Sequence, residues 1–334
     1  MMARYLSAIL CVLTLPALHA QSGAALRGAG ATFPAPIYQK WIEAFEAKYP
    51  GLPITYQPTG SEEGMRRLGA GGVDFAAADV LPTREMQTKL GVALFPSVVG
   101  AVVPAYNIRG LARDLRFTPE VLADIFLGRI TNWNDPKIQS LNRAVKLPSV
   151  AITVVHRSDG SGTTFVWSEF LSKTSAEWRA AVGEGSTLRW PVGQGAQGNG
   201  GVAALLTSTP FSIGYVEFIY ALQNELSYGA VRNAAGRFIR PEIDSIGAAA
   251  RTVDPAPDFR ISITNAPGRD AYPIASFTWF LMPSRMPEQK RQRLVAFLDW
   301  ALSAGQRQAA ALGYVALPED LAGRERAAVA HSNH

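Results

Sequence analysis

The sequence predicts an α/β protein made of two lobes with a ligand cleft between them. Short apolar segments typical of buried strands alternate with longer amphipathic segments typical of helices, which indicates α/β layering. Two long apolar segments, at 93–108 and 272–282, enclose the middle of the chain. A chain that leaves one lobe, builds the second and returns would cross between the lobes at these segments. Ligands of such folds bind in the cleft, at turns between strands and helices.

The composition is compatible with this architecture. The chain has 334 residues, of which 48% are hydrophobic and 18% charged, enough for one large or two medium domains. The formal net charge is +5, but the lysines and arginines form no run of five or six, so we expect no nucleic-acid partner. A moderate positive charge is compatible with a small anionic ligand.

Residues 1–20 are typical of a secretory signal peptide. They contain Arg4, then an apolar run, then small residues around Ala20. Cys11 lies in that run and is the only cysteine, so the mature chain, beginning at about Gln21, has none and needs no disulfide. No later segment reaches the ~20 apolar residues of a membrane span. We therefore expect an exported, soluble protein.

The first predicted helix, at 34–51, has one apolar face. Ile37, Trp41, Phe45 and Tyr49 are spaced four apart, and prolines occupy the first helical turn. Similar reasoning predicts the elements that follow, in chain order: strand 53–59, helix 60–72, strand 73–79, helix 118–128, strand 151–155, helix 164–172, helix 201–209, strand 212–218 and, over 287–314, a helix with its continuation.

Residues 227–270 show little periodicity, and we expect peripheral loops and short strands there.

Three junctions between a strand and a helix are rich in small and polar residues. They are at 28–36, 58–64 and 156–165. The first turn of each helix leaves backbone N–H groups unpaired at the positive end of the helix dipole, which suits an anion, especially beside hydroxyl groups. The alternative is that Thr32, Ser61 and Ser161 simply cap their helices. Three such junctions in one chain favour the anion site without excluding capping.

Arg157 gives the third junction a full positive charge. Its planar guanidinium offers a fork of donors suited to tetrahedral oxyanions. Asp159, two residues later, can hold that fork in one orientation. The alternative is a surface ion pair, worth about 0–1 kcal/mol.

Asp79 is a carboxylate at the end of an apolar strand, where burial without a partner is costly. In an anion site, a carboxylate helps only if the anion carries a proton that it can donate. Protonated phosphate meets that condition and sulfate does not, a mismatch that can discriminate by about 10⁴-fold. The alternative is that Asp79 only caps the end of its strand.

Six motifs in this order resemble one known family. They are GAGATFPAPIYQKW, GSEEG, VDFAAAD, ITNWNDPKI, VVHRSDGSGTTF and SIGYVEF. Together they closely resemble the periplasmic phosphate-binding proteins of Pst-type high-affinity phosphate ABC transporters, from about Gly28 to about Leu317. The most specific motif is Arg-x-Asp-Gly-Ser-Gly-Thr at 157–163.

The resemblance implies a type II periplasmic binding-protein fold that holds dehydrated phosphate between its lobes. It implies one charged donor, Arg157, oriented by Asp159, and one acceptor of the phosphate proton, Asp79. The remaining groups would donate hydrogen bonds from backbone N–H groups or hydroxyls, and they belong to Thr32, Phe33, Ser61, Ser161, Gly162 and Thr163. We expect lobe I to comprise 21–104 and 272–334, and lobe II to comprise 105–271.

One position departs from the family pattern. The family commonly has a second small residue after the serine, as in Gly-Ser-Ser-Gly, where this chain has Ser61-Glu62-Glu63-Gly64. We expect both glutamates to point to solvent and to favour the helix start. If either faces the cleft, it bears on affinity or on the identity of the ligand.

Other functional patterns are weaker. Gly193, Gly195 and Gly198 match a dinucleotide fingerprint, with Glu217 about 20 residues on, but a Trp-Pro pair precedes them where a core strand should end. Ser161 lacks the G-x-S-x-G setting of a hydrolase, and only His156 could serve it as a base. The histidines form no metal-ligand cluster.

The sequence thus predicts a non-enzymatic binding protein in the periplasm. It would capture inorganic phosphate and deliver it to the membrane permease of an ABC transporter. We expect a monomer with no cofactor or metal. The alternatives are a binding protein for another oxyanion, such as sulfate or arsenate, and an exported hydrolase of phosphate esters.

Overall fold

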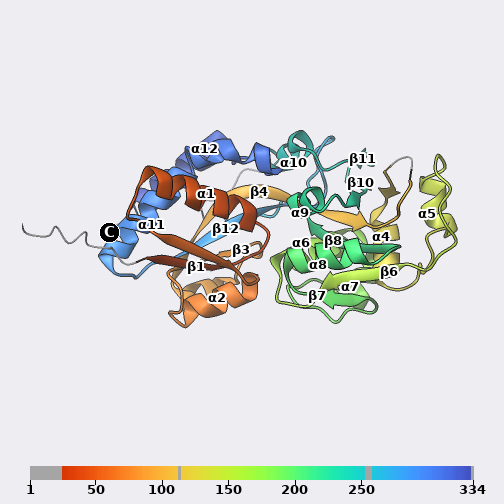
Figure 1. Cartoon of the computed structure of the whole chain (residues 1–334), viewed down its shortest axis with the longest axis horizontal. Helices are drawn as coiled ribbons and strands as arrows, with labels where there is room; N and C mark the ends of the chain where they lie inside the picture. The colour runs from red at the N-terminus through yellow and green to blue at the C-terminus, as the bar shows by residue number, and fades with distance from the viewer. Residues whose placement is uncertain (1–24, 112–113, 253–257, 332–334) are drawn as a thin grey trace, which may run out of the picture.

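The two lobes of the computed structural model share one strand of the main sheet (Figure 1). The structure describes residues 25–111, 114–252 and 258–331. Strand β4 (Val92–Tyr106) pairs antiparallel with β12 (Ala275–Pro283) along its first ten residues. From Val102 onward it pairs instead with β8 (Ser212–Glu217). The predicted apolar crossing at 93–108 is therefore one continuous strand shared by both lobes. The predicted signal peptide lies outside the described residues.

The main sheet has nine strands in the order β2-β1-β3-β12-β4-β8-β6-β7, with β9 also paired to β4. In lobe I, β1 pairs in parallel with β2 and β3, so the carboxyl ends of these strands meet at one edge. In lobe II, β6 pairs in parallel with β7 and β8. The bounds not yet given are β1 Leu26–Gly30, β2 Ile54–Pro58, β3 Phe75–Ala78, β6 Thr153–Arg157, β7 Gln194–Ala196 and β9 Ser227–Tyr228.

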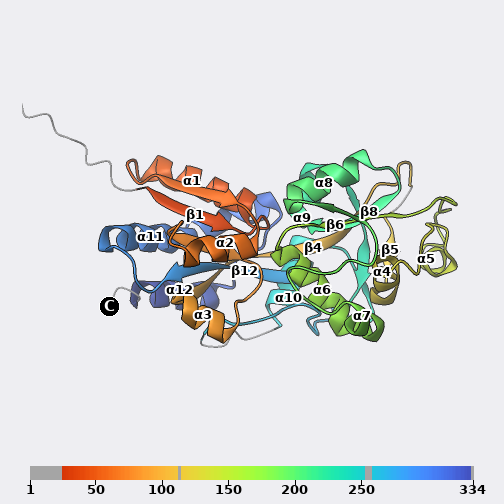
Figure 2. The ribbon, with the colours of Figure 1, turned by 90° about the horizontal axis from the view of Figure 1, so that it is seen from below.

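Helices cover the sheet in both lobes (Figures 1 and 2). Those of lobe I are α1 (Ala35–Lys48), α2 (Ser61–Gly69), α3 (Arg84–Leu90), α11 (Glu288–Ala301) and α12 (Glu319–His331). Those of lobe II are α4 (Pro119–Phe126), α5 (Pro136–Leu141), α6 (Gly162–Thr174), α7 (Ala176–Ala181), α8 (Gly198–Ser208) and α9 (Phe218–Gln223). Each parallel strand feeds such a helix through a short turn, as α/β layering requires.

The predicted apolar face of α1 is correct except at its end. Ile37, Trp41 and Phe45 are almost completely buried, and the Trp41 indole N–H donates to the Gly305 carbonyl at 2.8 Å. Tyr49 follows the helix and is 39% exposed. The predicted face therefore stops one turn early, because the chain leaves the helix before Tyr49 can reach the core.

The structure differs from the sequence-based prediction in one peripheral region and gives more detail in another. Residues 227–270 contain the expected short strands, β9, β10 (Ala230–Arg232) and β11 (Phe238–Ile239), but also a helix, α10 (Ile243–Ala250). This helix has only eight residues, too few for its apolar spacing to stand out from the polar sequence around it. Over 287–314 the structure has the predicted helix, which ends at Ala301, and its continuation is formed by two 3-10 turns, Gly305–Gln308 and Ala310–Leu312.

A small second sheet completes lobe II. It has three strands in the order β11-β10-β5, where β5 is Arg116–Phe117. Across the described ranges, no helix is both long enough and apolar enough to cross a membrane.

Helix α2 is held against β1 by a glycine contact, which gives a test of the packing. A Cβ atom on Gly64 would lie 2.4 Å from the Gly30 Cα and 2.8 Å from the Ala29 carbonyl oxygen. We expect Gly64→Ala to lower the free energy of unfolding by about 1–3 kcal/mol, because backbone atoms must move. Urea unfolding followed by circular dichroism measures it.

Gly323→Ala is the matched control. Gly323 lies in α12 with open space around it, so alanine should raise the free energy of unfolding by about 0.5–1 kcal/mol. Equal effects of the two substitutions would contradict this account of the α2 contact.

Candidate anion site between the lobes

The guanidinium of Arg157 is the charged centre of the site. Arg157 ends β6 and is only 3% exposed. Its Nε donates to Asp159 Oδ1 at 2.7 Å, and its Nη2 donates to Asp159 Oδ2. Asp159 thus holds the fork in a bidentate pair. Burial acts to raise the pKa of Asp159, but the bonds and charge of Arg157 outweigh it and lower the pKa.

The third junction continues into α6, and the hydroxyl groups of Ser161 and Thr163 there accept hydrogen bonds. Ser161 caps the helix, because its Oγ accepts the Thr164 N–H at 3.0 Å. Thr163 Oγ1 accepts from Arg157 Nη1 at 3.4 Å. Gly162 lies where a Cβ would come within 2.6 Å of both Asp79 and Ser61. Only glycine allows the start of α6 to approach lobe I this closely.

Ser61 joins the lobes at the start of α2. It is fully buried, and its Oγ accepts from the N–H of Asp79 at 3.3 Å and the N–H of Gly162 at 3.2 Å. The cap position of α2 is Gly60, which makes no side-chain cap. The capping alternative therefore does not describe Ser61, whose hydroxyl instead links the end of β3 to lobe II.

Asp79 is a buried carboxyl group with one unused oxygen. It is 2% exposed, and its Oδ1 accepts the Thr278 hydroxyl at 2.6 Å. Its Oδ2 has no hydrogen-bond partner in the described part of the chain, and it lies next to Gly162. Burial raises the pKa of Asp79 to about 7, although Thr278 and the charge of Arg157 act to lower it. Such a group needs a proton, either its own or a ligand's.

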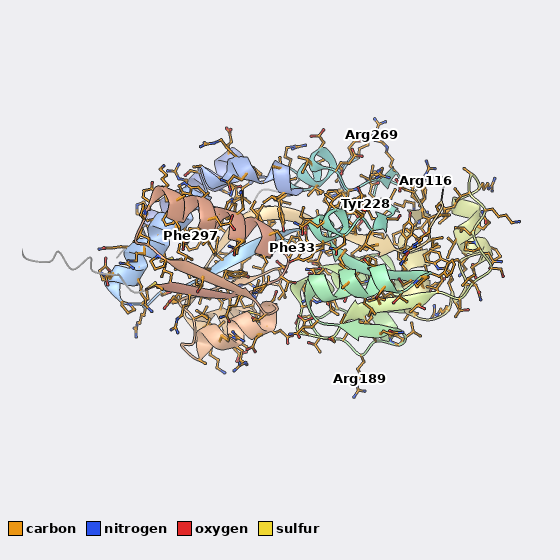
Figure 3. All side chains as sticks on the ribbon, in the orientation of Figure 1. Phe33, Arg116, Arg189, Tyr228, Arg269 and Phe297 are labelled. Carbon is orange, nitrogen blue, oxygen red and sulfur yellow. The ribbon has the colours of Figure 1, made fainter. Side chains whose placement is uncertain are left out.

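Thr32 and Phe33 bring the first junction to the same place. Thr32 Oγ1 accepts from the Asn199 N–H at 3.3 Å and from Asn199 Nδ2 at 3.0 Å. Pro34, not Thr32, occupies the cap position of α1, so the capping alternative fails here too. The Phe33 carbonyl accepts the Tyr314 hydroxyl at 2.6 Å, and Figure 3 shows Phe33 at the boundary between the lobes.

The structure thus brings together all nine residues selected from the sequence. It adds Asn199 and Thr278, which the sequence analysis missed. Asn199 Nδ2 bridges Thr32 and Thr163, at 3.0 Å to each hydroxyl. The signal for Asn199 was its place in the glycine-rich segment 193–201, which runs into the first turn of α8. Thr278 lies inside an apolar strand and gave no signal.

The competing patterns have structural roles instead. Gly195 lies within β7, and Gly198 donates its N–H to Asp159 Oδ1 at 3.0 Å, so these glycines form no phosphate loop between strand and helix. Glu217 is fully buried, its Oε2 accepts the Ile219 N–H at 2.9 Å, and burial raises its pKa well above the ordinary value. The His156 ring stacks on Trp190 at 4.7 Å. The described residues include no cluster of three metal-ligating side chains.

Comparison with known proteins identifies the family. The model of the PBP superfamily domain matches residues 16–304. Over 300 residues the chain is 42% identical to the phosphate-binding protein PstS of Pasteurella multocida, covering 89% of this chain and 87% of that protein. The chain belongs to the PstS family of phosphate-binding proteins. Its identity to PstS of Haemophilus influenzae is 40%, covering 93% of this chain and 94% of the relative.

Solved structures confirm the two-lobe fold. A high-affinity periplasmic phosphate-binding protein, PfluDING, bound with phosphate, is 22% identical with a TM-score of 0.74, covering 91% of this chain and 93% of that one. A phosphate ABC transporter substrate-binding protein from Clostridium perfringens is 19% identical with a TM-score of 0.66, and the match covers 88% of this chain and 100% of that one. At this identity the likeness establishes the fold and not the residues of the site.

The glutamates that depart from the pattern of PstS proteins differ from each other. Glu63 pairs with Arg66 and Arg67 of its own helix, each at 2.7 Å, and these arginines lower its pKa to about 2. Glu62 is exposed, but its carboxylate accepts hydrogen bonds from Ser186 and Thr187 of lobe II. Glu62 is thus exposed as expected, but its carboxylate also contacts lobe II, which the sequence did not predict.

The raised pKa of Asp79 predicts that the stability of the protein changes with pH. Because its pKa is about 7 in the folded protein against 3.8 as the ordinary value, the folded state binds this proton more tightly. The resulting stability is complete below pH 3.8 and is lost as the pH rises through about 7. Asp79→Asn keeps a neutral side chain at every pH. Between pH 5 and 7 the free energy of unfolding of the wild type should therefore fall, relative to that of Asp79→Asn, by about 1.4 kcal/mol per pH unit.

Urea unfolding at several pH values measures that difference, and both proteins retain Glu217. Asp270→Asn, at an ion pair where Asp270 is 68% exposed, is the control and should show no such trend. Parallel stability curves for Asp79→Asn and the wild type would rule out a proton held on Asp79.

Proposed function

We propose that this chain captures inorganic phosphate between its lobes and delivers it to the permease of a phosphate ABC transporter. The observation that carries the proposal is the unpartnered Asp79 Oδ2 beside the donors of Arg157 and the start of α6. A ring of donors with one acceptor matches an anion that still carries a proton. Membership in the PstS family and the phosphate-bound structural neighbours support it.

Each residue would have one role at the ligand. Arg157, held by Asp159, would be the charged donor, and Asp79 would accept the phosphate proton. The α6 start would add the positive end of its dipole. The neutral donors would come from Thr32, Phe33, Ser61, Ser161, Gly162 and Thr163. Since these groups come from both lobes, phosphate would stabilise the closed arrangement over any open one.

The remaining features of the function follow from the sequence. Residues 1–20 would direct export to the periplasm and be removed. Lobe I would comprise 21–104 and 272–334, and lobe II 105–271, which the change of partner of β4 at Val102 supports. The chain would act as a monomer without cofactor or metal. It would have no catalytic role, since Ser161 Oγ is used as a helix cap and His156 stacks on Trp190.

Titration calorimetry of residues 21–334 tests the ligand. We expect phosphate binding that sulfate does not compete for, with the greatest selectivity at pH 8–9, because Asp79 is then ionised and offers only lone pairs. Absence of phosphate binding between pH 5 and 9 would refute the proposal. A chromogenic phosphate ester should not be hydrolysed, and turnover that Ser161→Ala abolishes would favour the hydrolase.

Asp79 and Arg157 should differ in what they contribute. Asp79→Asn replaces an acceptor by an amide that can donate to sulfate, so we expect the phosphate-to-sulfate ratio of affinities to fall about 100-fold or more. Arg157→Lys keeps the positive charge and should weaken the binding of phosphate and of sulfate to similar extents. Competition calorimetry measures both ratios, and an equal loss of selectivity would refute the role of Asp79.

A further inference from the structure

Glu62 is an acidic residue of lobe I whose hydrogen bonds cross the boundary between the lobes. It lies in the first turn of α2, in lobe I, next to Ser61. Its backbone N–H donates to the Gly160 carbonyl of lobe II at 3.2 Å. Its carboxylate accepts the Ser186 hydroxyl, and both of its oxygens lie 3.4 Å from Thr187 Oγ1. Figure 2 shows α2 at this boundary, facing α6.

The surface of lobe II fits this side chain. A Cβ atom on Gly160 would lie 2.2 Å from Glu62 Oε2 and 2.6 Å from Glu62 Cβ. The glutamate therefore packs over a position that no other residue type could occupy without displacing it. Ser186 is also tied to the site, since its carbonyl accepts the Ser161 N–H at 2.9 Å.

Glu63 provides the contrast one residue along the helix. Its carboxylate is paired within lobe I, with Arg66 and Arg67. Its charge would thus have the same partners whether the lobes are together or apart. The side-chain partners of Glu62 belong to lobe II, so its hydrogen bonds require the lobes to be in contact.

We propose that Glu62 is an interlobe latch, a positioning residue that stabilises the closed arrangement and slows release of the bound anion without touching it. The inference rests on the proposed function and names a residue that sets how fast the bound phosphate is released. A hydroxyl bound to a carboxylate is a charge-assisted hydrogen bond, stronger than one to a neutral acceptor. Because the latch forms only after the lobes meet, its loss acts on dissociation.

Stopped-flow measurement of phosphate release from residues 21–334 tests the latch. Glu62→Ala should release phosphate about tenfold faster, with little change in the association rate. Glu63→Ala removes the same charge one residue away and should leave release within about twofold of the wild type. Slower release from Glu62→Ala would overturn the latch, because it would mean that the carboxylate mainly repels the anion.

A double-mutant cycle separates the latch from a general structural effect. Ser186→Ala removes the hydroxyl while keeping the carbonyl that accepts from Ser161. We expect it to speed release, and we expect no further acceleration when it is combined with Glu62→Ala. If the double variant instead multiplies the rate increases of Ser186→Ala and Glu62→Ala, the proposed contact is overturned. In the control, Ser186→Ala combined with Glu63→Ala should change the release rate by the product of the two separate changes.

A ligand-free measurement keeps the latch distinct from the proposed function. The mature chain has no cysteine, so Ala70→Cys in lobe I and Glu184→Cys in lobe II accept a fluorophore pair. Without phosphate, Glu62→Ala should lower the transfer efficiency between the lobes and Glu63→Ala should not. Equal efficiencies would overturn the latch even if phosphate binds. Failure of the wild type to bind phosphate would refute only the proposed function and leave this comparison valid.

Discussion

The site is organised by one requirement, that the buried charge of Arg157 be balanced. At 3% exposure the guanidinium has lost its water, a loss that costs several kcal/mol unless protein groups replace it. Asp159 supplies the balance with two hydrogen bonds. The same carboxylate accepts the N–H of Gly198, which fixes the start of α8 and hence Asn199. A single ion pair thereby sets the relative positions of β6, α6 and α8.

The balance leaves the anion site without a net positive charge. Arg157 and Asp159 neutralise each other, and Asp79, with a pKa of about 7, adds either nothing or a negative charge. Attraction for an anion must then come from the α6 dipole and from donors placed at fixed distances. Such a site selects by the match of donors and acceptors more than by charge. Selection of that kind can separate phosphate from sulfate, which have similar size and shape.

The sequence predicted the features that depend on neighbouring residues. The turns at 156–165 and 28–36 follow apolar strands, so their composition marked them as strand-to-helix junctions, and the structure places them together. Contacts between segments far apart in the chain left no local pattern. In the sequence, Thr278 is one polar residue within an apolar strand, and only the structure shows that its hydroxyl donates to Asp79 at 2.6 Å. Glu62 was recognised as unusual, but its partner Ser186 lies 124 residues away.

The shared strand limits how the two lobes can separate. β4 passes from β12 to β8 at Val102, so its backbone ladders hold both lobes to one continuous strand. The contacts across the site are of another kind, such as Ser61 Oγ with the Gly162 N–H. Each is worth about 1 kcal/mol, and water can replace it when the lobes part. Opening that keeps the ladders and breaks these contacts is therefore the least costly motion. The proposed Glu62 latch adds a charge-assisted hydrogen bond to this set, so its removal would shorten the time that the lobes stay together.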